Sequence, residues 1–419
     1  LPIFNPDDIL PDGIPVPYDT VITVPDPHDM PRPEPLVPFE EQEPAPVEKS
    51  VAFELYGTPC SVRIPDAPAP HLGSTDEKSV SEWWTETASG AYDVTVSDCL
   101  SLREELRLCD WAYLRLAGMF ASSYRDDWND AVLMQFFIMV KSGYKVRLAK
   151  ADDSFVILAP AQQGIVGMRY LQLGGAAYYI VEEKSPAPSY QICDCEYPGE
   201  KLMSLYLMLP NLEPSPKSLG AFSVPDGQGG NRQVNLSSDS NLFAFLDDYP
   251  HGGNWEVMSA ASLSDRLKAG LYPVLKESLR GKSPAEGAEL LLHFVQRSFS
   301  YMTDQEQFGY ERALFCDETF RFPYSDCEDR AILYSALVRD LLGLDVVLLY
   351  YPDHLATAVL FDEDVPGDYL MVDGRRFTVC DPTFIGAGIG RAMPQYRNVA
   401  AQVIRIAAAP HTPGVQAAP

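Results

Sequence analysis

The chain has 419 residues, of which 46% are hydrophobic, and its formal net charge is -27. This length is sufficient for two or three domains with hydrophobic cores. The acidic charge argues against nucleic acid as a partner, because phosphate backbones would be repelled, and it favours basic peptides or simple solubility. No run of about 18 apolar residues occurs, so we expect no membrane-spanning helix.

The eight cysteines are irregularly spaced, unlike those of a small disulfide-stabilised domain. Five of them carry no pattern that predicts their disulfide state: Cys60, Cys99, Cys109, Cys193 and Cys195. The pair Cys193 and Cys195 has no second pair at the spacing of zinc ligands, and the six histidines are scattered. We therefore expect no cofactor and no metal site.

Residues 1–48 are rich in proline and acidic residues. Proline removes backbone donors and the acids repel one another, so the sequence predicts an extended arm or linker. Its apolar segments "VITV" and "LVPF" could lie against a domain, and the arm could bind a protein partner in the cell envelope. The first residue is Leu1, which suggests a removed signal segment or a trimmed chain and weakly favours a periplasmic, envelope or secreted location.

A globular pattern begins at residue 49. Helical spacing of apolar residues appears at 101–124 and 129–143, and four strand-like segments follow, "YKVRLA", "FVILAP", "RYLQLG" and "AYYIVE". Residues 191–262 predict a β-rich middle region. Its Gly-Gln-Gly-Gly segment is not followed by a helix, so we interpret it as a loop and not as a phosphate-binding site.

Helices return in the region 263–400, followed by the strands "DVVLLYY", "LATAVLF", "YLMVDG" and "RFTVCD". Residues 401–419 are predicted to be a disordered tail. The predicted fold class is α+β. "GAGIGR" (386–391) does not open a clear helix, so it does not indicate a nucleotide-binding loop.

The plan of a helix followed by antiparallel strands occurs twice. A shift of 200 residues places Gly143 on Gly343, and after a slip of one residue Tyr170 falls on Tyr369. The shared spacing extends over some 55 residues and favours duplication of one unit. The first copy has Asp127, Ser154 and Glu182 where the second has Cys327, His354 and Asp381, so we interpret the first copy (49–190) as a degenerate scaffold or binding module.

Cys327 lies at the predicted start of a helix. Ser325 and Glu328 have the spacing of a capping box, which places Cys327 at the second helical position. Free N–H groups and the helix dipole favour a thiolate there. We expect Glu328 to turn back to its cap and Asp326 to face the backbone or solvent. The remaining acidic field opposes ionisation, so a neighbouring histidine is required.

His354 and Asp381 complete the candidate site. His354 begins a predicted strand, and Asp381 ends a later one, so the imidazole could face the thiol while the carboxylate orients it. Asp373 is the rival for the third role, but "DG" is typical of a hairpin turn. The other candidates have structural interpretations: Cys316 and Cys380 are buried, His293 packs on a helix, and His251 lies in a loop.

The segments "DCEDRAILYSALVRDLLGLDVVLLYYPDHLATAVLF" and "RFTVCDPTF" resemble the transglutaminase-like superfamily. The likeness covers about 280 to 395 and is greatest to bacterial, often exported members such as those of Bacteroidetes. It implies a papain-related core in which Cys327 is the nucleophile, His354 the general base and acid, and Asp381 the orienting acid. Two motifs depart from the family pattern. The sequence has His-Leu-Ala where many members have His-Ala-Trp, and Tyr-Ser-Asp before the cysteine where many have a glycine. These departures leave the oxyanion donors open: the Cys327 N–H is one candidate, and Tyr324 or Gln307 could supply a side-chain donor.

These residues predict a cysteine enzyme that acts on amide bonds of peptides or proteins through a thioester. With water as acceptor it would be a peptidase or amidase, which we favour, and with an amine it would be a cross-linking transglutaminase. The alternative is a non-catalytic interaction or scaffold protein of the cell envelope, because the first copy keeps the plan without the triad.

Overall fold

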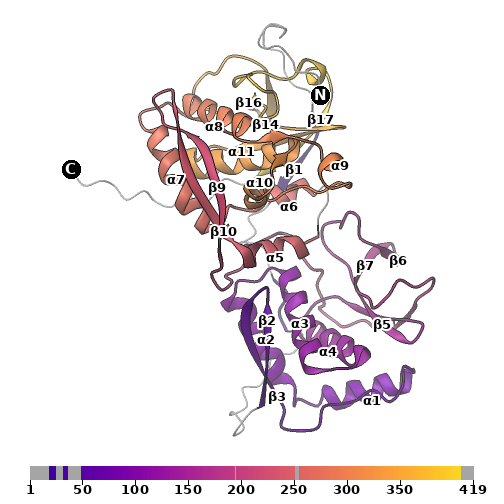
Figure 1. Cartoon of the computed structure of the whole chain (residues 1–419). Coiled ribbons are helices and arrows are strands. Elements are labelled where there is room, and N and C mark those ends of the chain that lie inside the picture. The colour runs from indigo at the N-terminus through magenta and orange to yellow at the C-terminus, as the bar shows by residue number, and fades with distance from the viewer. Residues whose placement is uncertain (1–17, 25–31, 36–48, 194, 251–253, 407–419) are drawn as a thin grey trace. The chain divides into compact units, whose positions relative to one another are not determined.

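The computed structural model describes residues 18–24, 32–35, 49–193, 195–250 and 254–406. The fold is α+β, as predicted, and the chain forms two compact units (Figure 1). The N-terminal unit comprises residues 31–214 and 241–251, and the C-terminal unit comprises residues 1–30, 215–240 and 252–419. No helix among the described residues is long and apolar enough to cross a bilayer.

The described residues of the N-terminal unit form a hairpin, five helices and one sheet. The hairpin is β2 (Lys49–Leu55) and β3 (Thr58–Ile64), and the helices are α1 (Glu77–Thr87), α2 (Asp93–Glu105), α3 (Asp110–Tyr124), α4 (Trp128–Lys141) and most of α5 (Ser240–Asp248). The sheet contains β4 (Arg147–Ala151), β5 (Ser154–Ala159), β6 (Tyr170–Leu173), β7 (Ala176–Glu182) and β8 (Gln191–Cys193). All of its pairs are antiparallel, in the order β6-β7-β5-β4-β8.

The C-terminal unit begins, in the central part of the chain, with a hairpin and a set of helices. The hairpin is β9 (Pro216–Pro225) and β10 (Asn231–Asp239), and the Gly-Gln-Gly-Gly segment forms its turn. The helices are α6 (Trp255–Ala260), α7 (Asp265–Leu279), α8 (Pro284–Ser298), α9 (Asp304–Gln307), α10 (Cys316–Arg321) and α11 (Cys327–Leu342). Two short strands, β11 (Ser300–Tyr301) and β12 (Tyr324–Ser325), pair just before α11.

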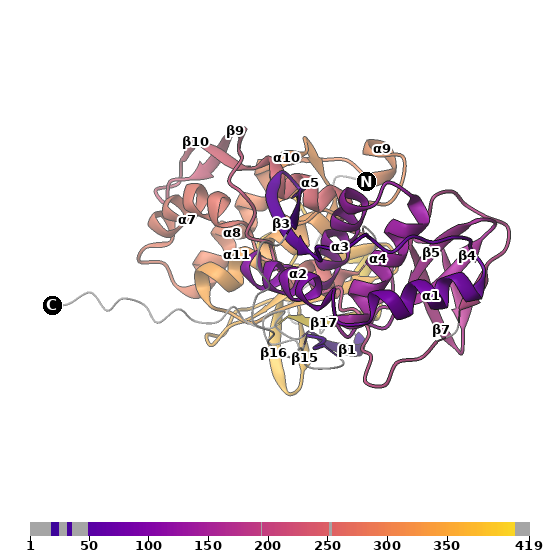
Figure 2. The ribbon, with the colours of Figure 1, turned by 90° about the horizontal axis from the view of Figure 1, so that it is seen from below.

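A six-stranded sheet completes this unit. It contains β13 (Val346–Tyr351), β14 (His354–Leu360), β15 (Tyr369–Val372), β16 (Arg375–Cys380), β17 (Ala401–Ile406) and β1 (Tyr18–Val24), with a 3-10 turn at Pro394–Tyr396. The order is β1-β17-β13-β14-β16-β15, and β1 alone is parallel to its neighbour. In Figure 2 this sheet can be followed through β15, β16 and β17.

The two units repeat one plan. The order β6-β7-β5-β4-β8 in the first is the order β15-β16-β14-β13-β17 in the second, and each set follows a long buried helix, α4 or α11. Both hairpins turn through residues with positive φ, Gly174 and Gly175 in one and Asp373 and Gly374 in the other. The predicted repetition of a helix followed by antiparallel strands is therefore present in the fold.

Several predicted boundaries are wrong. The edge strand β8 belongs to the first sheet and not to the middle region, and that region also contains α5 and α6. Residues 401–406, predicted as part of a disordered tail, form β17, whose residues Ala401 and Val403 are fully buried. Part of the proline-rich segment forms β1, because "YDTVITV" can hydrogen-bond along the edge of β17. The remainder of the tail and His251 lie outside the described residues.

Candidate active site

Helix α11 begins one residue later than the sequence predicted. Asp326 is the N-cap residue and Cys327 the first helical residue, where Ser325 and the second position were expected. The Asp326 N–H donates to Asp329 Oδ2 at 3.2 Å, the reciprocal bond of a capping box. Ser325 stays extended because it belongs to β12, and its Oγ accepts a hydrogen bond from Arg330 Nε. Cys327 still lies in the first turn, where backbone N–H groups are free.

The same shift changes the comparison with the first copy. Helix α4 begins at Trp128 with Asp127 as its N-cap, so Trp128 has the helical position of Cys327. Ser154 begins β5 as His354 begins β14, and Glu182 ends β7 where it forms an ion pair with Arg115 at 3.3 Å. The first copy therefore has neither a thiol nor an imidazole at these positions.

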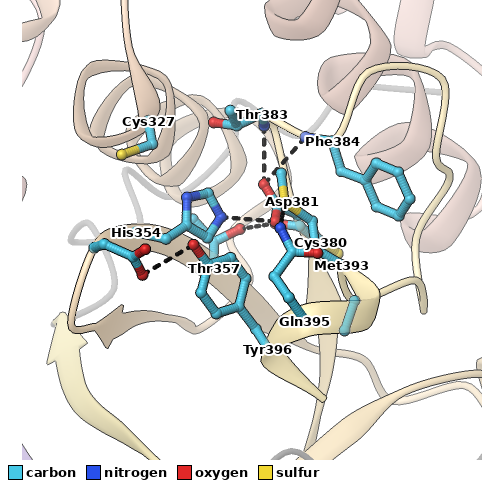
Figure 3. Close-up of polar contacts among 12 residues, drawn as sticks. Cys327, His354, Thr357, Cys380, Asp381, Thr383, Phe384, Met393, Gln395 and Tyr396 are labelled. Carbon is cyan, nitrogen blue, oxygen red and sulfur yellow. Dashed lines mark hydrogen bonds and ion pairs between the residues drawn. The ribbon is translucent and has the colours of Figure 1, made fainter. Parts of the chain in front are cut away.

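In the second copy His354 and Asp381 meet. His354 Nε2 lies 2.9 Å from Asp381 Oδ2, and the two residues are 6% and 2% exposed (Figure 3). Asp381 Oδ1 accepts the backbone N–H groups of Thr383, at 2.9 Å, and Phe384, at 3.3 Å. The carboxylate is thus fixed by its own loop and can hold the imidazole in one orientation.

Gln296, a residue that the sequence did not single out, holds this loop in place from α8. Its Nε2 donates to the carbonyl oxygens of Asp381, Phe384 and Ala387, and its Oε1 accepts from the Gly386 N–H. The side chain is buried. A buried amide inside an otherwise apolar helical face was the available signal, because burial obliges each of its polar atoms to find a partner.

Tyr396 covers the imidazole and was also missed. Its ring stacks on His354 with centroids 4.9 Å apart and planes inclined by 12°. Tyr351 stacks on Tyr396 at 4.7 Å and also lies 6.3 Å from the His354 ring, so the three rings form one group. The Tyr396 hydroxyl donates to Asp353 Oδ1 at 3.0 Å. Nothing in the sequence relates Tyr396 to His354, because the contact depends on how the segment between β16 and β17 folds back over the sheet.

Cys327 lies on the side of the imidazole away from Asp381 and is half-buried (Figure 3). Its Sγ donates a hydrogen bond to Glu328 Oε2 at 3.0 Å, so the prediction that Glu328 turns back to the cap is wrong. Burial, followed by the charges of Glu328 and Asp326, raises the pKa of the Cys327 thiol well above its usual value. A hydrogen bond from the Leu355 N–H acts in the opposite direction and indicates that the sulfur lies beside the start of β14.

Carboxyl groups gather around this helix start. We refer to five residues as the acidic cluster: Asp304, Glu311, Asp326, Glu328 and Asp329. Burial, with the neighbouring carboxylates, raises the pKa of Asp304 to about 7 and that of Asp326 to about 8. The pKa values of Glu328 and Asp329 are raised as well, again chiefly by burial. The sequence drew attention to Asp326 and Glu328 but not to Asp304 or Glu311, which come from α9 and the following loop.

The oxyanion candidates have different surroundings. Gln307 ends α9, and its Nε2 is buried without a hydrogen-bond partner among the described residues. Tyr324 is half-buried in β12. Within the described part of the chain no hydrogen bond connects either side chain to Cys327, so the structure does not bring them to the sulfur in the way that it brings Glu328.

The remaining candidates lie elsewhere. Asp373 is exposed in the β15–β16 hairpin and pairs with Arg405, which leaves the role of orienting acid to Asp381. Cys316 and Cys380 are buried, as predicted, and His293 lies on α8 with Glu289 at 3.4 Å. All eight cysteines are free thiols.

The chain was compared with known proteins in three ways. No family model matches it, and neither the curated proteins nor the solved structures contain a significant match.

Proposed function

We propose that the C-terminal unit is a transglutaminase-like cysteine enzyme that acts on amide bonds of peptides or proteins. The observation that carries the proposal is the buried pair of His354 Nε2 and Asp381 Oδ2, 2.9 Å apart, with Cys327 at a helix start on the other side of the imidazole. A nucleophile, a base and a group that orients the base are the parts required for acyl transfer.

In the proposed reaction the Cys327 sulfur attacks the carbonyl carbon of the amide, and its proton passes to His354 Nδ1. His354 then gives that proton to the nitrogen of the leaving amine, and a thioester remains on Cys327. Water attacks the thioester, His354 takes the proton of the water, and the acid is released while the thiol regains its proton. The backbone N–H of Cys327 is the first oxyanion donor that we propose, and Gln307, with its unpartnered Nε2, is the better of the two side-chain candidates.

Hydrolysis is the favoured outcome, since water needs no acceptor site of its own, and amine transfer is the alternative. The strongly acidic chain would favour basic substrates through long-range attraction. As part of this proposal the protein is exported to the periplasm or envelope, where residues 1–48 could contact an envelope partner.

One observation favours a second candidate, a non-catalytic interaction protein. The Cys327 thiol donates to Glu328, and its raised pKa disfavours the thiolate on which nucleophilic attack depends. The first copy keeps the plan of the fold without a thiol, so the plan itself does not require chemistry.

A cysteine-reactive probe separates the two candidates. Cys195 is exposed and would be labelled in any case, so the comparison is made in a Cys195→Ala background. We expect strong labelling that is lost in Cys327→Ala and reduced in His354→Ala, together with hydrolysis of fluorogenic peptide amides. Equal labelling with and without Cys327 would exclude the enzyme, and incorporation of a fluorescent amine into a protein substrate would identify the transferase.

A further inference from the structure

A short segment of the proline-rich arm, residues 32–35, lies against the N-terminal unit, to which it belongs. Its sequence is Arg-Pro-Glu-Pro. Pro33 is buried, Arg32 and Pro35 are half-buried, and Glu34 is exposed. One buried proline between more exposed neighbours is typical of a peptide that inserts an anchor residue into a binding site. The residues around Pro33 therefore show what such a site recognises.

Gly143, which follows α4, lies very close to the backbone of this segment. The position that a Cβ atom would take at Gly143 is 2.0 Å from the carbonyl oxygen of Glu34 and 3.0 Å from its carbonyl carbon. Contacts this short are sterically forbidden, so any larger residue at this position would displace the segment. Gly143 also has a positive φ of 91°. The end of α4 is therefore shaped to admit a peptide backbone.

Arg103, on α2, contacts the backbone of the same segment. Its side chain is 2% exposed, its Nη1 donates to the Pro33 carbonyl oxygen at 3.4 Å, and its Nη2 donates to Asp110 Oδ1 at 3.2 Å. The guanidinium also lies over the ring of Tyr144, 5.5 Å from the ring centroid. Because Asp110 and Tyr144 hold the guanidinium, the unit itself positions the donor for the peptide carbonyl.

Arg32 determines which proline of the arm enters the site. Its Nη1 forms an ion pair with Glu104 Oε1 at 2.9 Å, and its Nη2 lies 3.4 Å from Met208 Sδ. Arg32 is the only lysine or arginine in residues 1–48, which contain many prolines and acidic residues. No other register of the arm places a lysine or arginine beside Glu104, so the ion pair favours Pro33 as the anchor.

We propose that the N-terminal unit, which contains the first copy of the repeated plan, is a binding module for peptide segments with the pattern Arg-Pro-Glu-Pro, and that residues 32–35 of the same chain occupy its site. The segment is tethered, so its effective concentration is high, and a separate peptide of the same pattern must compete with it. The module gives a role to a copy that has neither the thiol nor the imidazole of the second. The inference does not depend on catalysis by Cys327.

A labelled peptide tests the site in the full chain. The probe is a fluorescein-labelled peptide with the sequence of residues 29–37, Asp-Met-Pro-Arg-Pro-Glu-Pro-Leu-Val, and its fluorescence anisotropy reports binding. In the double variant Arg32→Glu with Pro33→Ser the tethered segment loses its ion pair and its anchor, so the site becomes available. We expect saturable binding to the double variant and at least about tenfold weaker binding to the wild type, whose own segment competes. Equal affinity for the two chains, or no saturable binding to the double variant, would overturn the proposal.

A glycine substitution added to the double variant localises the peptide. Gly143→Ala should weaken peptide binding by about tenfold or more, because the added Cβ takes the place of the peptide carbonyl. Gly343→Ala is the matched control, since Gly343 ends α11 with a φ of 66° and the substitution strains the backbone there in the same way. It should leave the peptide affinity unchanged. Equal peptide affinity in the two alanine variants would contradict the position of the site.

An exchange of charge tests the site without altering a buried residue. Glu104 is exposed, so Glu104→Lys should leave the fold intact. Added to the double variant, it should weaken binding of the original peptide several-fold and strengthen binding of a peptide that has glutamate in place of its arginine. Unchanged affinity for both peptides would contradict the pairing of Arg32 with Glu104 and with it the proposed recognition.

Discussion

The Nε2 atom of His354 and the Oδ2 atom of Asp381 lie 2.9 Å apart in a buried environment. The carboxylate can hold the Nε2 proton, which leaves Nδ1 as the basic nitrogen on the side of Cys327 (Figure 3). If the proposed enzyme is correct, Asp381→Asn should lower kcat/KM by on the order of 10³-fold or more, because the amide no longer enforces this tautomer. Steady-state hydrolysis of a peptide amide measures the effect.

Asp373→Asn is the matched control for Asp381→Asn. Asp373 was the alternative orienting acid, but it is exposed in a hairpin and pairs with Arg405. We expect its kcat/KM to equal that of the wild type. A loss of activity in Asp373→Asn comparable to that in Asp381→Asn would contradict the assignment of the third residue.

Tyr396 should act as a positioning residue for His354. Tyr396→Phe keeps the stacked ring and loses only the hydrogen bond to Asp353, so its activity should stay within a few-fold of the wild type. Tyr396→Ala removes the stack and should reduce kcat/KM by roughly tenfold, in line with the energy of aromatic pairs.

Separate values of kcat and KM distinguish positioning from a general loss of stability. In Tyr396→Ala the imidazole gains mobility, so kcat should fall by roughly tenfold while KM stays near that of the wild type, whereas Tyr396→Phe should keep both values within a few-fold. An equal kcat in all three proteins would show that Tyr396 serves the fold alone.

The strand and helix content near the site was predictable because its signals are local. Apolar spacing located α11 and the strands that follow, and the duplication was visible because Gly143 and Gly343 end corresponding helices. The helix start was misplaced by one residue, because Ser325 and Asp326 are both good caps and only the pairing of β12 with β11 decides between them.

Contacts between distant segments could not be predicted in this way. Gln296 meets the loop after β16 from 85 residues away, and Tyr396 reaches His354 across the sheet. Asp304 joins the acidic cluster only because α9 packs beside the start of α11. Each depends on tertiary packing, for which the periodicity of a single segment carries no information.

Gln296 should be important for stability. Gln296→Leu removes the donor shared by three loop carbonyls and the acceptor for the Gly386 N–H, all in a buried place. Unsatisfied buried groups cost about 1–3 kcal/mol each, so we expect a loss of about 3 kcal/mol in the free energy of unfolding. Denaturant titration measures it. The control is Gln395→Leu, which lies at an exposed position and should change the free energy of unfolding by no more than about 0.5 kcal/mol. An equally small effect of Gln296→Leu would contradict its role in holding the loop.

The pair of Glu289 and His293 on α8 should make stability depend on pH. The hydrogen bond from His293 lowers the pKa of Glu289 below its usual 4.5, and the bond to Glu289 raises the pKa of His293 above its usual 6.5. Because the folded state favours protonated His293, its contribution is complete below pH 6.5 and is lost as the pH rises through the raised pKa. The contribution of Glu289 is present above pH 4.5 and is lost on acidification through the lowered pKa.

The pair of Glu289 and His293 therefore stabilises the fold most between about pH 4.5 and pH 6.5. We expect His293→Gln to flatten the decline in melting temperature of the wild type above pH 6.5. Glu289 also accepts the Ile389 N–H from the segment that follows Asp381, so uncoupling the pair should loosen this segment first, as faster amide exchange there would show. If the melting temperatures of the wild type and His293→Gln changed with pH in parallel, the pair would contribute nothing to stability.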